Sequence, residues 1–371
     1  MTNETILFTP GPLSISRTTK NVMMKDWGSR DAEFIDLTRD ISLKLEKIAG
    51  VDQELPTHHC ILIQGSGTFI IEATIDTLIP KDSKVLVLVN GAYGKRMAKI
   101  CHIHGLSYVT LETGEDTPPT ESQIAQFLEE DQNIKYVLAV HCETTSGILN
   151  PIYDIANAVS KAGCYLIIDA MSSFGAIPLD VKEIKCAAIV ASSNKCLEGA
   201  PGVGFAIIDK AILLKAEKNA SSLSLDLFDQ WHNFKNTGQW RFTPPTHVLA
   251  ALGQALNEHV MEGGVKGRGA RYKSNCNILI KGMEFIGFKT YLDSKLQAPI
   301  IVTFLLPRVK GFIFSDFYSR LLKKGFMIYP GKITKVDSFR IGCIGHIHQI
   351  DLENLIEAVD QIINELGIAL K

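Results

Sequence analysis

The N-terminal half of the chain alternates short apolar runs with longer segments of helical periodicity. The apolar runs lie at 60–63, 84–89, 106–111, 136–140 and 165–168. A strand buried on both faces reads as a continuous apolar run, and parallel strands need a crossover, usually a helix, between them. The alternation therefore predicts an α/β fold with a mostly parallel, doubly wound sheet. Such sheets bind ligands at the carboxyl ends of their strands, so candidate site residues are expected there.

Length and composition favour a globular protein of two domains. The chain has 371 residues, of which 46% are hydrophobic and 21% charged, and its formal net charge is −2. This length suffices for two domains. A charge so close to zero gives no reason to expect nucleic acid or an anionic membrane as a partner. We place a large domain at 16–260. Residues 1–15 and 261–371, with strands expected at 300–306 and 338–341, then form a smaller α+β domain.

The N-terminus and the cysteines indicate a cytoplasmic protein. Residues 1–5 lack the basic region and apolar run of a signal peptide, and we find no apolar stretch of membrane-spanning length. The eight cysteines are scattered without a CxxC pair, as in proteins whose thiols stay reduced. The histidine pairs have no third ligand nearby, so we expect no metal site; these pairs are His58 and His59, His102 and His104, and His346 and His348.

Two residues at the ends of apolar runs suggest a cofactor. Lys195 lies in 191–204, a stretch rich in Ser, Gly and Pro between two apolar runs, and Asp169 directly follows the run at 165–168. Taken singly, Asp169 could cap the next element and Lys195 could be a solvated turn lysine. Together they are typical of a pyridoxal phosphate (PLP) site. There the lysine carries the aldehyde as a Schiff base and the carboxylate keeps the pyridine nitrogen protonated.

A third strand end has the composition of an anion site. The run at 60–63 is followed by Ser66, Gly67 and Thr68 and then by a helix to about residue 78. Free N–H groups at a helix N-terminus, with nearby hydroxyls, bind phosphate. The stretch matches neither a nucleotide P-loop nor GxGxxG, so a small cofactor phosphate suits it better. Tyr93, at the next strand-to-helix turn, could lie on a flat ligand or pack under the turn.

Three further residues are candidates for substrate binding. Arg340 lies in an apolar strand, where a planar anion would compensate its burial, although an arginine extending from a strand edge is the plainer interpretation. Trp27 and Arg30 flank Gly-Ser in what is either a binding loop or a packed surface turn. The polar, aromatic-punctuated segment 219–240 is expected to be an irregular excursion or interface loop.

Extended strings in this sequence resemble a known family. Segments 9–12, 90–94, 141–147 and 340–342 are similar to the class V branch of the fold-type I PLP aminotransferases. Segments 27–31 and 193–199 resemble the 2-aminoethylphosphonate:pyruvate transaminases within it. The resemblance covers nearly the whole chain. It implies transamination of 2-aminoethylphosphonate with pyruvate, and an alanine- or serine-glyoxylate aminotransferase is the alternative.

The same resemblance implies a role for each candidate. Lys195 would form the Schiff base, Asp169 would pair with the pyridine nitrogen, and Tyr93 would stack on the ring. Phosphate would be held by Ser66, Gly67 and Thr68, with Thr144 at the polar edge of the ring and Asn194 beside the lysine. Thr243 would reach the phosphate from the neighbouring subunit, which implies a homodimer. Arg340, Arg30 and Trp27 would bind substrate. A cysteine desulfurase or a PLP-binding regulator fits less well.

Overall fold

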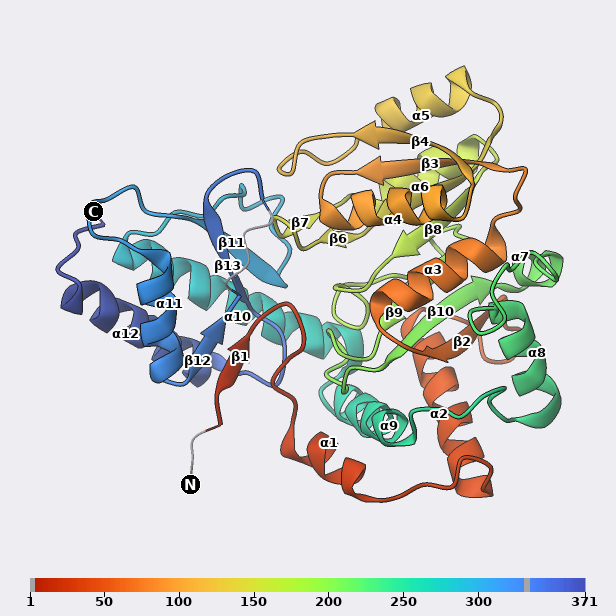
Figure 1. Cartoon of the computed structure of the whole chain (residues 1–371), viewed down its shortest axis with the longest axis horizontal. Coiled ribbons are helices and arrows are strands. Elements are labelled where there is room, and N and C mark those ends of the chain that lie inside the picture. Colours follow the sequence, from red (N-terminus) through yellow and green to blue (C-terminus); the bar gives the residue numbers. More distant parts are fainter. Residues whose placement is uncertain (1–3, 330–333, 371) are drawn as a thin grey trace.

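Seven strands form one sheet in the larger part of the molecule (Figure 1). The structure is a computed structural model that describes residues 4–329 and 334–370. In spatial order the strands are β2 (His58–Gln64), β10 (Val203–Asp209), β9 (Ala188–Ser192), β8 (Tyr165–Asp169), β5 (Ile134–Val140), β3 (Lys84–Val89) and β4 (Ser107–Glu112). β10 is antiparallel to both neighbours, and the other neighbouring strands are parallel. The predicted, mostly parallel α/β sheet is confirmed.

Helices cover both faces of this sheet. The hydrophobic cluster on one face draws on α2 (Ala32–Ile48), α5 (Glu121–Glu130), α6 (Ile152–Lys161) and α9 (Thr246–Met261). The cluster on the other face draws on α3 (Gly67–Leu78), α4 (Ala92–Ile103), α7 (Lys210–Lys215) and α8 (Leu227–Thr237). In β8, Leu166 and Ile168 belong to the first cluster and Ile167 to the second, because successive strand residues face opposite ways. Burial on both faces explains the continuous apolar runs.

The C-terminal residues and the first strand share a separate core. α10 (Gly264–Ile286) leads to β11 (Ile301–Leu305), α11 (Phe314–Lys323), β12 (Phe326–Ile328), β13 (Ser338–Gly342) and α12 (Gln349–Glu365). β11 pairs with β13 antiparallel, and β12 pairs in parallel with β1 (Ile6–Phe8). Phe8 is fully buried in the same cluster as side chains of α10, β11, β13 and α12. The remaining elements are α1 (Arg17–Asn21), the 3₁₀ turn η1 (Val22–Met24) and the hairpin β6 (Cys142–Glu143) with β7 (Ile148–Leu149).

These clusters support the division into domains that the sequence suggested. We propose a large domain at 16–260 and a small one from 1–15 with 261–371, of which residues 1–3, 330–333 and 371 lie outside the described part. α9 extends to Met261, so the proposed boundary falls at the end of that helix. Among the described helices, none combines the length and the apolar character needed to cross a membrane.

The expectation of an irregular segment at 219–240 was wrong. This stretch contains α8, which begins after Asp226, whose carboxylate caps the helix by accepting a hydrogen bond from the Asp229 N–H at 3.0 Å. Phe228 and Trp231, three residues apart, are buried in the cluster under the sheet face that α3 and α4 cover. The pattern was missed because the apolar face of α8 is narrow and the rest of the helix is polar.

Candidate active site

A cavity of about 440 Å³ lies where several strands of the sheet end at the same edge. Val140 ends β5, Cys142 follows it in β6, Asp169 ends β8, and Ser192 ends β9, and all four line the cavity. The N-terminal turns of α3 and α4 supply the opposite wall. Seven of the candidates predicted from the sequence line this one cavity: Ser66, Gly67, Thr68, Tyr93, Asp169, Asn194 and Lys195.

Lys195 brings a buried amine to this cavity. Its Nζ donates a hydrogen bond of 2.5 Å to the carbonyl of Pro10, in the N-terminal segment. Burial lowers the pKa of Lys195 to about 8, although the charge of Asp169 acts in the opposite direction. Near neutral pH the amine is therefore deprotonated far more often than that of an exposed lysine. A neutral amine is the form that can attack a carbonyl or accept a proton.

Asp169 places a carboxyl group in the same wall. Its Oδ1 accepts a hydrogen bond of 3.0 Å from the Met171 N–H, which stabilises the charged form. Burial is the larger effect and raises the pKa of Asp169 to about 6. A cationic partner in the cavity would reverse this shift. The carboxyl group therefore suits a ligand that carries a protonated nitrogen.

The start of α3 lies in the wall of the cavity, as expected for an anion site. Ser66 is the N-cap residue and has extended backbone, and the first turn of a helix leaves N–H groups without helical partners. A Cβ on Gly67 would lie 2.7 Å from the sulfur of Met171, so only glycine fits without displacing that side chain. Arg96 adds a positive charge: it lines the cavity, and its Nη1 donates to the Thr68 hydroxyl at 3.2 Å.

Tyr93 is fixed in the cavity wall by a buried carboxylate. Glu143 is fully buried, and its Oε2 accepts hydrogen bonds from the Tyr93 and Gly94 N–H groups at 3.0 and 3.3 Å. Its Oε1 accepts from the N–H and the hydroxyl of Thr145 at 3.0 and 2.6 Å. Glu143 thus caps the first turn of α4 from another strand end, because an acceptor there satisfies N–H groups that the helix leaves free.

Thr144 and Arg340 adjoin the cavity through Tyr93. Burial raises the pKa of the Tyr93 hydroxyl, whereas the nearby Thr144 side chain and the Arg340 charge act in the opposite direction. Arg340 is 1% exposed; its Nη1 donates to the Thr144 carbonyl at 2.6 Å, and its guanidinium carbon lies 4.6 Å from the Tyr329 ring centre. β13 therefore brings a buried guanidinium from the small part of the molecule toward the site.

Three site residues were not singled out from the sequence. Arg96 lies one helical turn after Tyr93, and its guanidinium carbon is 4.8 Å from the Tyr93 ring centre. The i, i+3 spacing from Tyr93 could have indicated it. Glu143 lies within the family-like segment 141–147, but nothing in the sequence indicated that it caps α4. The Pro10 carbonyl contacts Lys195 across 185 residues, a pairing that only the tertiary structure creates.

Three predicted residues lie elsewhere on the surface of the chain. Among the described residues that line the cavity, Trp27, Arg30 and Thr243 are absent. The Trp27 ring packs on Phe34 of α2, with ring centres 6.2 Å apart, whereas Arg30 and Thr243 are exposed. Thr243 was expected to act from a neighbouring subunit, so exposure is consistent with that role. No group of three or more metal-binding side chains is found among the described residues.

The residues of the cavity fit PLP in kind and in placement. A buried amine, a buried carboxyl group, a helix N-terminus with hydroxyls and an aromatic ring all line one cavity. These groups match an aldehyde, a pyridine nitrogen, a phosphate and a flat ring, respectively. Lys195, Asp169, the 66–68 turn and Tyr93 are thus the residues that would hold the cofactor.

Comparison with known proteins reveals close relatives over the full length. Residues 23–340 match the family described as Aminotransferase class-V. The chain is 49% identical over 365 residues, 98% of both lengths, to the 2-aminoethylphosphonate--pyruvate transaminase of Pseudomonas fluorescens. It is also 49% identical over 368 residues, 99% of both lengths, to the enzyme of the same name from Pseudomonas putida.

Solved structures share the fold at lower identity. The ureidoglycine-glyoxylate aminotransferase of Bacillus subtilis superposes with a TM-score of 0.89 at 20% identity, over 100% of this chain and 96% of the other. The pyridoxamine-pyruvate aminotransferase of Mesorhizobium loti gives 0.88 at 23% identity, over 98% and 93%. The fold-type I architecture is thereby confirmed. With the family match spanning most of its length, the chain belongs to the class-V aminotransferases, enzymes that use PLP.

Proposed function

We propose that this aminotransferase moves the amino group of 2-aminoethylphosphonate to pyruvate, releasing phosphonoacetaldehyde and L-alanine. The observation that carries the transamination is the placement of the Lys195 amine and the Asp169 carboxyl group in one buried cavity. The choice of substrates is supported by the relatives that are 49% identical over nearly the full length and bear that name.

Each residue of the cavity has a separate proposed role. PLP, when bound, supplies an electron sink for the carbon that carries the amino group. The Lys195 amine would move a proton to and from the substrate carbon; its pKa, lowered by burial to about 8, suits both accepting and donating near neutral pH. Asp169 would keep the ring nitrogen protonated. Ser66, Gly67 and Thr68 would hold the phosphate, and Tyr93, Thr144 and Asn194 would contact the ring.

Arg340 is the proposed anion clamp of both half-reactions. Phosphonate and carboxylate must occupy the site in turn, and a guanidinium offers two parallel N–H donors to either group. Its place on β13, with Tyr329 stacked on it, keeps this group buried and oriented. Trp27 and Arg30 remain proposed substrate residues, which would serve the partner's cavity because they do not line their own.

We also propose a cytoplasmic homodimer. The exposed Thr243, outside the cavity of its own chain, supports a site completed by a second copy. The eight cysteines are free thiols, most of them buried, as expected in a reducing compartment.

The proposal is tested by incubating the purified enzyme with PLP, 2-aminoethylphosphonate and pyruvate and measuring alanine and the aldehyde. We expect alanine to form in amounts equal to the aldehyde, and an absorbance band near ~400 nm that is typical of PLP on a lysine. Lys195→Ala should lose both the band and turnover. A clear preference for L-serine or L-alanine with glyoxylate would overturn the proposed substrates and favour a glyoxylate aminotransferase.

A further inference from the structure

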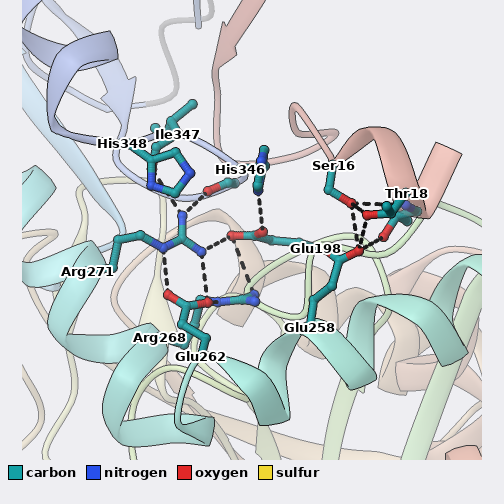
Figure 2. Close-up of polar contacts among 12 residues, drawn as sticks. Ser16, Thr18, Glu198, Glu258, Glu262, Arg268, Arg271, His346, Ile347 and His348 are labelled. Carbon is teal, nitrogen blue, oxygen red and sulfur yellow. Dashed lines mark hydrogen bonds and ion pairs between the residues drawn. The ribbon is translucent and has the colours of Figure 1, made fainter.

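The side chains of Glu198, Glu262, Arg268 and Arg271 form a cluster of ion pairs, in which both arginines come from α10 (Figure 2). Glu198, three residues after Lys195, is 2% exposed. Its Oε1 lies 2.7 Å from Nη2 of Arg271 and 3.4 Å from Nη1 of Arg268, and both arginines also bind Glu262, the C-cap residue of α9. None of these four side chains lines the proposed PLP cavity; all four line a separate pocket.

Arg268 holds the peptide that follows Lys195. It is 1% exposed, and its Nη1 donates a hydrogen bond of 2.6 Å to the carbonyl of Cys196. Its Nε donates to Oε2 of Glu262 at 2.5 Å, which fixes the plane of the guanidinium. A hydrogen bond from a charged donor in a dry interior is stronger than one between neutral groups. The backbone beside Lys195 is thus attached to a rigid helix.

The turn that carries Lys195 needs such support. Glu198 has a φ of 60°, the left-handed region that residues other than glycine rarely adopt. Its N–H donates to the Lys195 carbonyl at 2.8 Å, which closes the turn. The Tyr272 hydroxyl donates to Glu198 Oε1 at 2.6 Å. An unfavourable backbone conformation persists where surrounding contacts determine it, and here buried side-chain bonds do so.

Arg271 connects this turn to the strand that bears the anion clamp. Its Nη1 donates to the carbonyls of Gly345 and Ile347 at 2.7 and 3.0 Å, just beyond β13 with Arg340. Burial opposes ionisation of Glu262, but hydrogen bonds and charges from Arg271 and Arg268 prevail and lower its pKa to about 2. Glu262 therefore stays charged through the neutral range and keeps both arginines aligned.

We propose that Arg268 is a positioning residue for Lys195: by holding the Cys196 carbonyl it fixes where the amine enters the cavity. This rests on the proposed function, in which Lys195 carries the cofactor. The lysine side chain is long and flexible, so its reach depends on a fixed backbone. A displacement of ~1 Å in a reacting group can cost about a hundredfold in rate.

The experiment compares Arg268→Gln and Arg268→Lys with the wild type and with Arg320→Gln. Arg320 is a matched control, because it also pairs with two carboxylates but does so near the surface of the small domain. Three readouts are taken from the full-length protein. Borohydride reduction followed by peptide mass spectrometry identifies the lysine that holds PLP. Acetylation of the PLP-free protein across pH gives the midpoint for Lys195, and steady-state kinetics gives kcat and KM.

In Arg268→Gln we expect kcat to fall at least about tenfold while KM changes less than about threefold. The Lys195 midpoint should rise by about half a pH unit or more, since a less fixed amine is better hydrated. Arg268→Lys should recover part of kcat, because lysine keeps the positive charge. Recovery should be incomplete, because one ammonium cannot bind Cys196 and Glu262 with the same geometry. Arg320→Gln should resemble the wild type in all three readouts.

Equal midpoints and kcat values in Arg268→Gln and Arg320→Gln would overturn the positioning role, even if Arg268→Gln melts at a lower temperature. If Arg268→Gln does not fold, the same readouts are taken from Arg268→Lys and Glu262→Gln instead. Glu262→Gln is informative because glutamine keeps a hydrogen-bond acceptor and removes the charge. Failure of wild-type Lys195 to hold PLP after reduction would instead refute the proposed function.

Discussion

At the scale of single residues, the candidate site holds two groups whose burial is unfavourable until a ligand arrives. Asp169 and Lys195 line the same cavity. Burial raises the pKa of Asp169 and lowers the pKa of Lys195, so it favours the neutral form of each group. Both shifts disfavour the charged states that a free surface residue would have. PLP would supply an aldehyde for the amine and a protonated nitrogen for the carboxylate. Bound PLP would therefore offset the free-energy cost of burying these two groups.

Asp169→Asn should stabilise the PLP-free protein at pH 8 while weakening its function. A carboxyl group whose pKa is raised to about 6 favours folding while it is protonated. That contribution is present below about pH 4 and is lost as pH rises through 6. At pH 8 the asparagine variant should therefore gain on the order of 2 kcal/mol over the wild type, and at pH 4 nothing. Thermal unfolding of the stripped proteins measures this, with the exposed Asp36→Asn as control. A gain of the same size at pH 4 would contradict the assignment.

Arg340→Lys should slow both half-reactions. The variant keeps the charge but loses the planar pair of donors and the stacking on Tyr329, whose ring centre lies 4.6 Å from the guanidinium carbon. Loss of a buried bidentate pair costs about 2–5 kcal/mol, equivalent to roughly thirtyfold or more in rate. Stopped-flow absorbance would follow each half-reaction, with the exposed Arg39→Lys for comparison. Small, equal losses in the two variants would place the anion clamp elsewhere.

At the scale of elements, α10 links the parts of the candidate site. One face packs in the core of the small domain, and its first turns contact the large one. Gly269 lies so close to the segment after β8 that a Cβ would be 2.3 Å from the Ala176 carbonyl oxygen. On the same part of the helix, Arg268, Arg271 and Tyr272 contact residues of the Lys195 loop. The helix therefore holds the loops that follow both Asp169 and Lys195.

Gly269→Ala should destabilise the protein by about 2 kcal/mol or more, because the added methyl group meets backbone that cannot rotate away. Ser274→Ala, on the exposed face of the same helix, should change the stability by less than about 0.5 kcal/mol. Urea unfolding of the two variants compares them directly. Similar midpoints would mean that the contact between α10 and Ala176 is loose.

At the scale of the whole molecule, a single copy of the chain leaves some predicted site residues away from the cavity. Thr243 precedes α9 and is exposed, far in sequence from the strand ends that form the cavity. A two-fold dimer would bring the same surface of each copy to the other, so one Thr243 could serve each of two sites.

Heterodimers with differently tagged subunits test whether Thr243 acts in the partner's site. A dimer of one Lys195→Ala chain and one Thr243→Asp chain should retain about half the wild-type activity, because one site then has an intact lysine and an intact threonine. The matched control carries both substitutions in one chain beside a wild-type chain and should be inactive. If Thr243 served its own chain, the two results would be exchanged.

The sequence by itself determined the sheet and the composition of the site. Continuous apolar runs specify strands that are buried on both faces, and the polar residues near the end of a run indicate what the strand end presents. Asp169 and Lys195 were predicted as site residues in this way, and both line one cavity. The hydrogen bond from Lys195 to Pro10, the cap that Glu143 places on α4, and the clamp of Arg268 on Cys196 were decided only by the tertiary structure. Local patterns encode which face of an element is buried, whereas these contacts join residues tens to hundreds of positions apart. Their geometry is set by how the sheet, α10 and the N-terminal segment pack together.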